Sequence, residues 1–197
     1  NAYQRILRSL SELLIDYDQE CNGFPVYGFG GKPVGQKQIN QLFHVSTPPD
    51  AETANPEQAI ELLLNDYVYT LVRTTLSGPA EFTGILERAK AIAKEYKAKG
   101  SKDYLVVVIL TDGEIWRFDE SLKELLEIAK LPVSVILAGI GEDQQLLESL
   151  VKLDGNRRVV YSFKEKYMDG KKKKTRTKKL YADRIFTKYV SFNSVGQ

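Results

Sequence analysis

Cysteine and histidine are almost absent from this 197-residue chain, which contains only Cys21 and His44. A lone cysteine excludes a disulfide within the chain and is typical of a reducing compartment such as the cytoplasm. A zinc site or a Cys–His nucleophilic pair needs several such side chains close together, which the sequence does not supply. We therefore interpret Cys21 as a lone, partly buried thiol and His44 as a structural residue in a strand.

Long hydrophobic runs are absent as well. No apolar stretch approaches the roughly 20 residues that span a bilayer, and no signal-peptide pattern opens the chain. The phosphate-binding motifs GxGxxG and GxxxxGK[ST] and the nucleophile motif GxSxG are missing too. The sequence therefore predicts a soluble piece that lacks the signatures of a nucleotide-binding or hydrolytic enzyme.

Charges nearly balance, with a net charge of +2, but they are unevenly distributed. Nine Lys and Arg residues stand against Glu165 and Asp169 between residues 164 and 179, which gives this segment +7 and leaves −5 for the rest. Like charges at this density predict a solvated, mobile loop. The alternative is contact with an anionic phospholipid surface. The contacting residues would be Lys171, Lys172, Lys173, Lys174, Arg176, Lys178 and Lys179. No aromatic side chain lies between Lys171 and Lys179, so nucleic acid is not an expected partner.

The most informative stretch is DYLVVVILTDGEIWRF, from Asp103 to Phe118. Residues Tyr104 to Leu110 have the unbroken apolar character of a strand that is buried on both faces, as in a parallel sheet covered by helices. A hydroxyl, a carboxylate and a glycine follow immediately, in Thr111-Asp112-Gly113. Open α/β sheets place their ligand crevice at the carboxyl ends of such strands, so this turn is where we expect function.

Apolar residues recur at helical spacing in five further places. The predicted helices run from Asn1 to Tyr17, from Asn55 to near Ser77, from Phe82 to Gly100, from Ser121 to Ala129 and from Gln144 to Leu153. Asn55 and Pro56 form a favourable helix start, and Ser121 with Glu124 has the spacing of a capping box.

Strand patterns alternate with these helices. The predicted strands are Gly23 to Phe29, which the turn Gly30 to Pro33 ends, then Gln41 to Val45, Tyr104 to Leu110, Pro132 to Ile140 and Arg157 to Phe163. Tyr181 to Phe192 is predicted to be a helix or a strand. This alternation predicts an α/β fold, with a doubly wound, mainly parallel sheet and helices on both faces. We expect one domain over residues 1–197.

Several segments together resemble the copine-type von Willebrand factor A domain. The matching segments are NAYQRILRSLSELLIDYD, FPVYGFGG, the SGPAEF turn, YLVVVILTDGEI, KLPVSVILAGIG and RIFTKYVSF, in family order over nearly the whole chain. The resemblance implies a Rossmann-like sheet with a metal-ion-dependent adhesion site (MIDAS) at its upper end. In such domains a DxSxS motif on the first strand, a Thr in the next loop and the Asp of a TDG turn hold one Mg²⁺ or Mn²⁺.

Residue by residue, only Asp112 matches this ligand set. The residues begin at the helix that follows the DxSxS strand, so we expect that motif in a preceding segment of a longer parent protein. The family's loop reads GPTNF, whereas Ala80 stands here in place of the liganding Thr. Thr83 and Glu81 are the candidate substitutes, because hard cations prefer oxygen ligands. We therefore expect a degenerate, weakened site for Mg²⁺ or Mn²⁺.

Each residue near this turn also has a plainer interpretation. Asp112 could cap the turn after its strand through its own backbone. Glu114 and Trp116 are candidates for contact with a partner protein, but Trp116 and Phe118 could instead belong to the core.

The resemblance implies a protein-interaction module without catalytic activity of its own. Its intracellular parent would be cytoplasmic and would associate peripherally with membranes, through calcium-binding C2 domains elsewhere in the parent. One alternative is the A domain of a copine-related ubiquitin ligase, which needs a RING motif of paired CxxC sequences that these residues lack. A remote alternative is a Rossmann-like nucleotide-binding enzyme.

Overall fold

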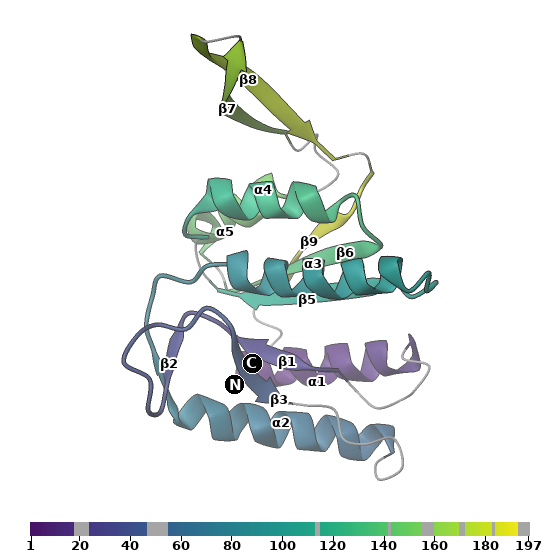
Figure 1. Cartoon of the computed structure of the whole chain (residues 1–197). Coiled ribbons are helices and arrows are strands. Elements are labelled where there is room, and N and C mark those ends of the chain that lie inside the picture. Colours follow the sequence, from purple (N-terminus) through teal and green to yellow (C-terminus); the bar gives the residue numbers. More distant parts are fainter. Residues whose placement is uncertain are drawn as a thin grey trace. The chain divides into compact units, whose positions relative to one another are not determined.

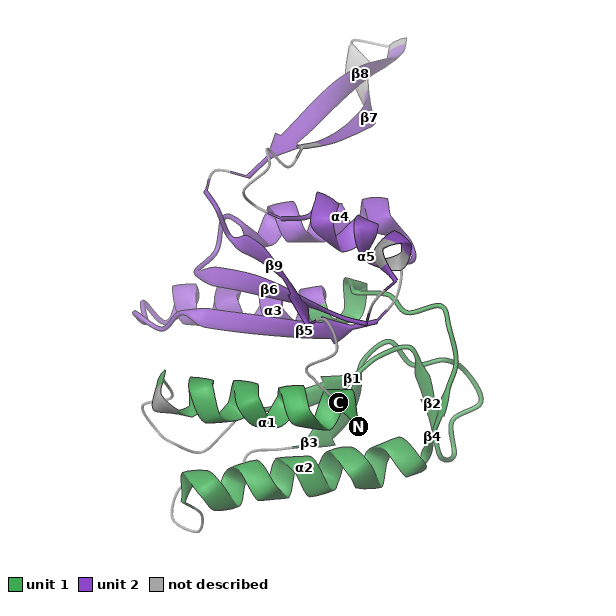
Figure 2. Ribbon diagram, turned by 180° about the vertical axis from the view of Figure 1, so that it is seen from behind, with its two compact units in different colours: residues 1–85, 196–197 green, residues 86–195 purple. Residues whose placement is uncertain are grey.

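The computed structural model describes residues 1–17, 24–46, 55–112, 115–141, 143–154, 160–169, 172–182 and 184–192. These residues divide into two compact units, the first within residues 1–85 and the second within residues 86–195 (Figure 2). Within these ranges no helix combines the length and the apolar character that a membrane span requires.

Two helices with matching N-terminal caps form the frame of the first unit. They are α1 (Ala2–Leu14), continued by the 3₁₀ turn η1 (Ile15–Tyr17), and α2 (Pro56–Val72). Each begins with a capping box in which an Asn side chain accepts from the backbone N–H three residues later, at 2.9 Å from Asn1 and from Asn55. The start predicted at Asn55-Pro56 is confirmed, because this box and the proline satisfy or remove the free N–H groups of the first turn.

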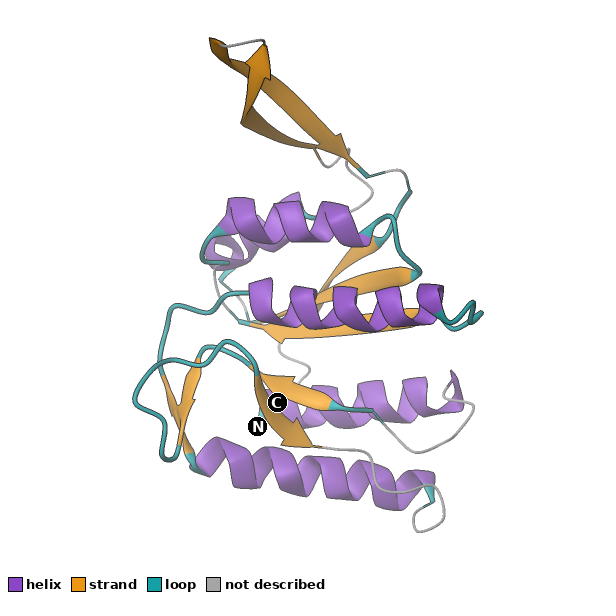
Figure 3. Ribbon diagram, in the orientation of Figure 1, coloured by secondary structure: helices purple, strands orange, loops and turns teal. Residues whose placement is uncertain are grey.

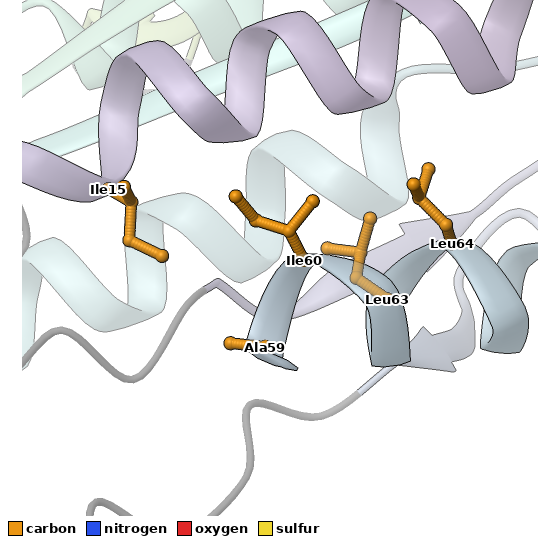
Figure 4. Close-up of a cluster of buried hydrophobic side chains, with 5 residues drawn as sticks. All are labelled: Ile15, Ala59, Ile60, Leu63 and Leu64. Atoms are coloured by element: carbon orange, nitrogen blue, oxygen red, sulfur yellow. The ribbon is translucent and has the colours of Figure 1, made fainter. Parts of the chain in front are cut away.

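The core of the first unit lies between these helices. Figure 4 shows the buried side chains, which are Ile15, Ala59, Ile60, Leu63 and Leu64. Leu7, Phe24 and Val26 pack against this cluster. The 3.6-residue spacing along α2 therefore serves to hold α1 and the neighbouring strand β1 against one apolar stripe.

Two short antiparallel pairs complete the first unit: β1 (Val26–Gly28) with β3 (Phe43–Ser46), and β2 (Gly31–Pro33) with β4 (Thr74–Leu76). The second pair corrects the predicted turn at Gly30 to Pro33 and the predicted helix end near Ser77. Helix α2 stops at Val72, and the hydroxyl of Thr74 donates to the carbonyl of Thr70 at 2.8 Å. The β-branched pair Thr74-Thr75 favours an extended backbone, so the chain leaves the helix early.

The second unit is built on a three-stranded sheet in which every pairing is parallel (Figures 1 and 3). Its order is β5-β6-β9, with β5 (Leu105–Thr111), β6 (Val133–Ile140) and β9 (Thr187–Phe192). The helices are α3 (Thr83–Ala98, which begins in the first unit), α4 (Phe118–Ile128) and α5 (Gln144–Lys152). The α/β class and the parallel pairing of the two central strands are confirmed, and the segment after Tyr181 contributes a strand.

The two faces of this sheet differ in burial. Val133, Val135 and Leu137 of β6 are fully buried on one face. On that face a Cβ at Gly139 would lie 3.0 Å from the Leu147 side chain of α5, so helix and strand are in close contact. On the other face Tyr104 and Val106 are 52% and 48% exposed.

The expectation that the whole run from Tyr104 is buried on both faces is therefore wrong for Tyr104 and Val106. The reason is the handedness of the connections. Right-handed crossovers from β5 to β6 and from β6 to β9 place α4 and α5 on the same face, so these two helices do not cover Tyr104 and Val106 on the other face. Val107 and Ile136 are partly buried, as a packed sheet requires.

Helix α4 begins earlier than predicted. Its first residue is Phe118, and its N-cap residue, Arg117, has the left-handed φ of 53°. Ser121 is fully buried inside the helix and donates its backbone N–H to the carbonyl of Arg117, so the predicted capping box at Ser121 is wrong. The acidic residues Asp119 and Glu120 occupy the first turn instead, where negative charge stabilises a helix.

The basic segment forms a strand, so the predicted loop is wrong. Strand β7 (Val160–Asp169) pairs antiparallel with β8 (Lys172–Tyr181) as a separate two-stranded ribbon (Figure 1). A β-strand directs successive side chains to opposite faces, so its like charges are divided between two surfaces instead of crowding one. Lys171 lies outside the described residues, as do residues 157–159 of the strand predicted at Arg157 to Phe163.

Helices α3 and α4 are joined by ion pairs. Lys90 of α3 binds Glu124 and Glu127 of α4, and its Nζ lies 2.9 Å from Glu127 Oε2. Partial burial lowers the pKa of Lys90, but its hydrogen bonds to both carboxylates outweigh burial and raise that pKa overall. The hydrogen bond from Lys90 lowers the pKa of Glu127. Both groups therefore stay charged near neutral pH and hold the helices side by side.

Arg184, which precedes β9, connects four elements of the second unit. Its guanidinium donates to the carbonyls of Ala129 at 3.1 Å and Leu131 at 2.7 Å, and also to that of Val133. It donates to the hydroxyl of Tyr104 at 2.8 Å as well. The end of α4, the start of β6 and the entry to β5 are thus fixed relative to β9.

We predict that Arg184→Ala lowers the free energy of unfolding by about 2 to 3 kcal/mol, because carbonyls that accept from a charged donor lose it. Arg184→Lys should lose most of this too, since an ammonium cannot reproduce the planar fork. Trp116 is the single tryptophan and lies in the same unit, so its fluorescence in a urea titration follows the change.

The matched control is Arg88→Ala, which removes an exposed arginine of α3 and should stay within about 0.5 kcal/mol of wild type. Equal stability of Arg184→Ala and Arg88→Ala would contradict the structural role assigned to Arg184.

Candidate functional site

Asp112 lies at the carboxyl end of β5, directly after the buried Thr111, and its side chain is exposed. The structure thus places the predicted carboxylate where a parallel sheet presents its ligand crevice. Gly113 and Glu114 lie outside the described residues. The turn-capping interpretation of Asp112 and the partner contact of Glu114 therefore stay predictions.

Trp116 is an exposed aromatic residue just before the N-cap of α4. Half of its side chain is exposed (50%), and the guanidinium carbon of Arg117 lies 5.9 Å from the ring centroid. Ile115, directly before it, is buried, and its N–H donates to Ser149 Oγ at 3.5 Å. The buried Ile115 therefore holds the backbone that presents the exposed indole of Trp116. The alternative that Trp116 belongs to the core is wrong, whereas Phe118 is half-buried at the start of α4.

Glu81 and Thr83, the two candidate substitutes for the missing liganding Thr, belong to the first unit, and Asp112 belongs to the second. The structure brings Glu81 and Thr83 together, since Thr83 Oγ1 donates to Glu81 Oε2 at 3.3 Å. Ala80 itself carries no ligating oxygen. The Thr83 hydroxyl is thus already engaged by the neighbouring carboxylate.

Gln41 fixes the loop that carries these residues. Its side-chain oxygen accepts from the N–H groups of Gly30 and Glu81, each at 3.0 Å, and its amide donates to the carbonyl of Pro79 at 2.7 Å. Gly30 has φ of 68°, and a Cβ there would lie 3.0 Å from the Ala80 side chain. No sequence pattern indicates this role, because a polar residue between two glycine-containing turns matches no motif.

These residues do not fit the metal site that the family resemblance implies. The described part of the chain contains no group of three or more His, Cys, Asp or Glu residues that could hold a metal ion. Ala80 removes one expected ligand, and Thr83 donates to Glu81. A weakened Mg²⁺ or Mn²⁺ site at Asp112 stays a prediction.

The ribbon of β7 and β8 has two chemically different faces. Its half-buried face carries Tyr161 and Phe163, whose rings stack at 5.7 Å, and Glu165. Glu165 accepts from Arg176 Nε and Lys178 Nζ, each at 2.7 Å. These hydrogen bonds, from Lys178 first and then from Arg176, lower the pKa of Glu165. Glu165 therefore offsets part of the positive charge on this face.

The other face is exposed and basic. The pairing register places Lys164 and Lys166 of β7 on it with Lys173 and Lys179 of β8. Of the predicted membrane-contact residues whose side chains are described, Lys173 and Lys179 belong to this face, and Lys174, Arg176 and Lys178 alternate to the side of Glu165. Lys171 and the side chain of Lys172 lie outside the described part of the chain. Lys164 and Lys166, which share this face, were not among the predicted residues. The alternation YSFKEK at Tyr161 to Lys166 was the signal that could have found them.

We predict that Gln41→Ala speeds amide hydrogen exchange at Gly30 and Glu81 by about tenfold or more, because both N–H groups lose their acceptor. Nuclear magnetic resonance of the two amides measures the change. Gln36→Ala is the matched control, since the side chain of Gln36 accepts an exposed hydrogen bond from the amide of Asn40 at 2.9 Å. Unchanged exchange in Gln41→Ala would contradict the proposed role of Gln41 in the loop.

Comparison with known proteins places the chain in one family. A family model described as Copine matches residues 1–193. Copine-C of Dictyostelium discoideum is 32% identical over 165 residues, which cover 83% of this chain and 29% of that protein. Protein BONZAI 1 of Arabidopsis thaliana is 30% identical over 141 residues, which cover 72% of this chain and 24% of that protein. The chain thus spans less than a third of these relatives, and by the family match it belongs to the copine family.

Proposed function

We propose that this chain is the partner-binding domain of a copine-like protein. The family match supports the domain type, and the short share of each relative that it covers supports a longer parent. In this proposal the parent is cytoplasmic and docks on phospholipid in a calcium-dependent way through C2 domains elsewhere. The domain itself binds intracellular proteins and performs no chemistry.

The observation that carries the proposal is the exposed indole of Trp116, which follows the end of β5 in the sequence and directly precedes the N-cap of α4. Interfaces obtain most of their binding free energy from a few residues, among which Trp and Arg are enriched. Trp116 has Arg117 beside it, and the buried Ile115 holds the backbone in place. A partner that covers the indole gains apolar burial without having to reorganise the sheet beneath it.

Trp116→Ala should therefore weaken partner binding by about thirtyfold, which corresponds to the 2 kcal/mol of a typical interface hot spot. The measurement is quantitative crosslinking in cells, followed by affinity determination with the purified partner. Tyr69→Ala is the matched control, because Tyr69 is also exposed and also lies under an arginine, Arg73, at 4.8 Å. Partners retained by Trp116→Ala, or lost equally in Tyr69→Ala, would contradict the proposal.

We also propose that the exposed lysine face of β7 and β8 contacts an acidic membrane. Four lysines on one exposed surface support this proposal, because each lysine near an anionic bilayer contributes about 1 kcal/mol and needs no fixed geometry. The contact would supplement a stronger anchor elsewhere in the parent.

Co-sedimentation with phosphatidylserine vesicles tests this contact. Wild type should bind at low salt and lose most binding at physiological salt, because screening weakens exposed charges. The variant with Lys164, Lys166, Lys173 and Lys179 changed to Gln should lose binding at both. The control changes Lys94, Lys97, Lys99 and Lys102 to Gln, which removes the same charge from exposed positions in and after α3. Equal loss in both variants would show that only net charge matters and would defeat the assignment to this face.

A further inference from the structure

The exposed face of the β7–β8 ribbon has an ordered arrangement of charges and hydroxyl groups. In the register Thr177 lies opposite Lys164, and Thr175 lies opposite Lys166. Lys179 and Lys173 occupy the next positions of β8 on the same face, one at each end of this block. Two threonine hydroxyls are thus enclosed by four lysines, and all six side chains are exposed.

The spacing of this block follows from strand geometry. Lys164 and Lys166 are two residues apart on one strand, which separates them by about 6.8 Å. Directly opposite Cβ atoms lie about 5 Å apart, and diagonal neighbours such as Lys164 and Lys179 are about 7 to 8 Å apart. Lys173 and Lys179 are six residues apart on β8, about 20 Å, so the four lysines form a row in which each lies about 7 to 8 Å from the next. One ligand with several negative groups can therefore span two or three neighbouring lysines of this row.

The charge of this block is not neutralised by the ribbon itself. None of the positions that alternate to this face in β7 and β8 is acidic, and no ion pair of Lys164, Lys166, Lys173 or Lys179 occurs among the described residues. Glu165 is on the opposite face, where it binds Arg176 and Lys178. The exposed lysines therefore remain available to an anion from outside the chain.

A ligand with a single negative charge would leave most of these lysines unmatched. A ring that carries two or more phosphates could bring its oxygens to several ammonium groups at once, and charge-assisted hydrogen bonds of this kind are the strong ones. The hydroxyls of Thr175 and Thr177 would donate to the same oxygens.

Single-stranded nucleic acid fits less well than a phosphorylated headgroup. Sequence-tolerant binding of a strand uses aromatic rings as stacking platforms. The stacked rings of Tyr161 and Phe163 lie on the other face, and no aromatic residue alternates with the four lysines between Lys164 and Lys179.

From these observations we infer that the block of Lys164, Lys166, Lys173, Lys179, Thr175 and Thr177 is a recognition surface for membrane lipids whose headgroup carries several phosphates. This inference rests on the proposed acidic-membrane contact and goes further, because it assigns a preference among anionic lipids. The surface would bind several phosphates of one headgroup, whereas the acidic-membrane contact proposed above depends only on the charge of the bilayer.

The test uses the 197-residue chain and two kinds of phosphatidylcholine vesicle. One contains a phosphatidylinositol bisphosphate and the other contains phosphatidylserine, at amounts that give equal surface charge. Wild type should bind the bisphosphate vesicles about tenfold more tightly, a difference that one or two additional lysine contacts supply. The four-lysine variant should lose this preference, and the control at Lys94, Lys97, Lys99 and Lys102 should keep it.

A second variant separates recognition from charge and from folding. Thr175→Val with Thr177→Val keeps the charge and the β-branched shape and removes only the hydroxyls. It should bind phosphatidylserine vesicles like wild type and lose part of the preference, by about threefold, because a hydroxyl is worth less than a charge. Circular dichroism checks that every variant keeps its strand content.

The outcomes distinguish this inference from the general contact. Equal binding of wild type to both vesicles overturns the headgroup preference and leaves the acidic-membrane contact standing, whereas binding to neither overturns both. Tight binding of soluble inositol phosphates without binding to vesicles would show that the ligand is a free inositol phosphate and would contradict the assignment to a membrane lipid. Tighter binding of single-stranded RNA than of bisphosphate vesicles, lost in the four-lysine variant, identifies a nucleic-acid surface instead.

Discussion

The guanidinium of Arg184 is the interaction on which the second unit depends most. The last carbonyls of a helix have no partner within the helix. After the end of α4 the carbonyl of Leu131 accepts from the N–H of Val133 at 2.8 Å, and Arg184 adds a charged donor to the carbonyls of this segment. Arg184 supplies a planar set of donors to Ala129, Leu131 and Val133 at once. Because Arg184 lies just before β9, the same bonds fix where β9 starts. The N–H of Val135 in β6 then donates to the carbonyl of Phe186, directly before β9, at 2.8 Å. The parallel register of β6 and β9 follows.

Sequence patterns predicted the central part of this unit well, because its signals are local. Leu105 to Thr111 and Val133 to Ile140 are continuous apolar runs, and such runs pair in parallel when helices connect them. The Asn55 cap was equally readable, since its partner Gln58 is three residues away. The strand-end position of Asp112 followed from the same argument.

Features set by distant residues could not be predicted in this way. Pairing of Gly31 to Pro33 with Thr74 to Leu76 joins segments about forty residues apart, and no local pattern selects that partner. Ser121 matched a capping box, but tertiary burial placed it inside α4. The basic ribbon was missed because composition counts charges without regard to alternation. Pairing with β7 places Glu165 beside Arg176 and Lys178, and Lys164, Lys166, Lys173 and Lys179 are exposed on the other face.

The exposed indole and the lysine block differ in the physics by which they would bind. Trp116 offers apolar area on a fixed backbone, so its contribution to affinity depends on the shape of the partner and little on salt. The lysines offer charge, which acts over about 8 to 10 Å in physiological salt and tolerates many geometries. A two-stranded ribbon is only marginally stable alone, and β7 and β8 have contacts with α4 at their base. An anionic surface that binds one face would therefore also stabilise the ribbon, so that membrane contact and the order of β7 and β8 would reinforce each other.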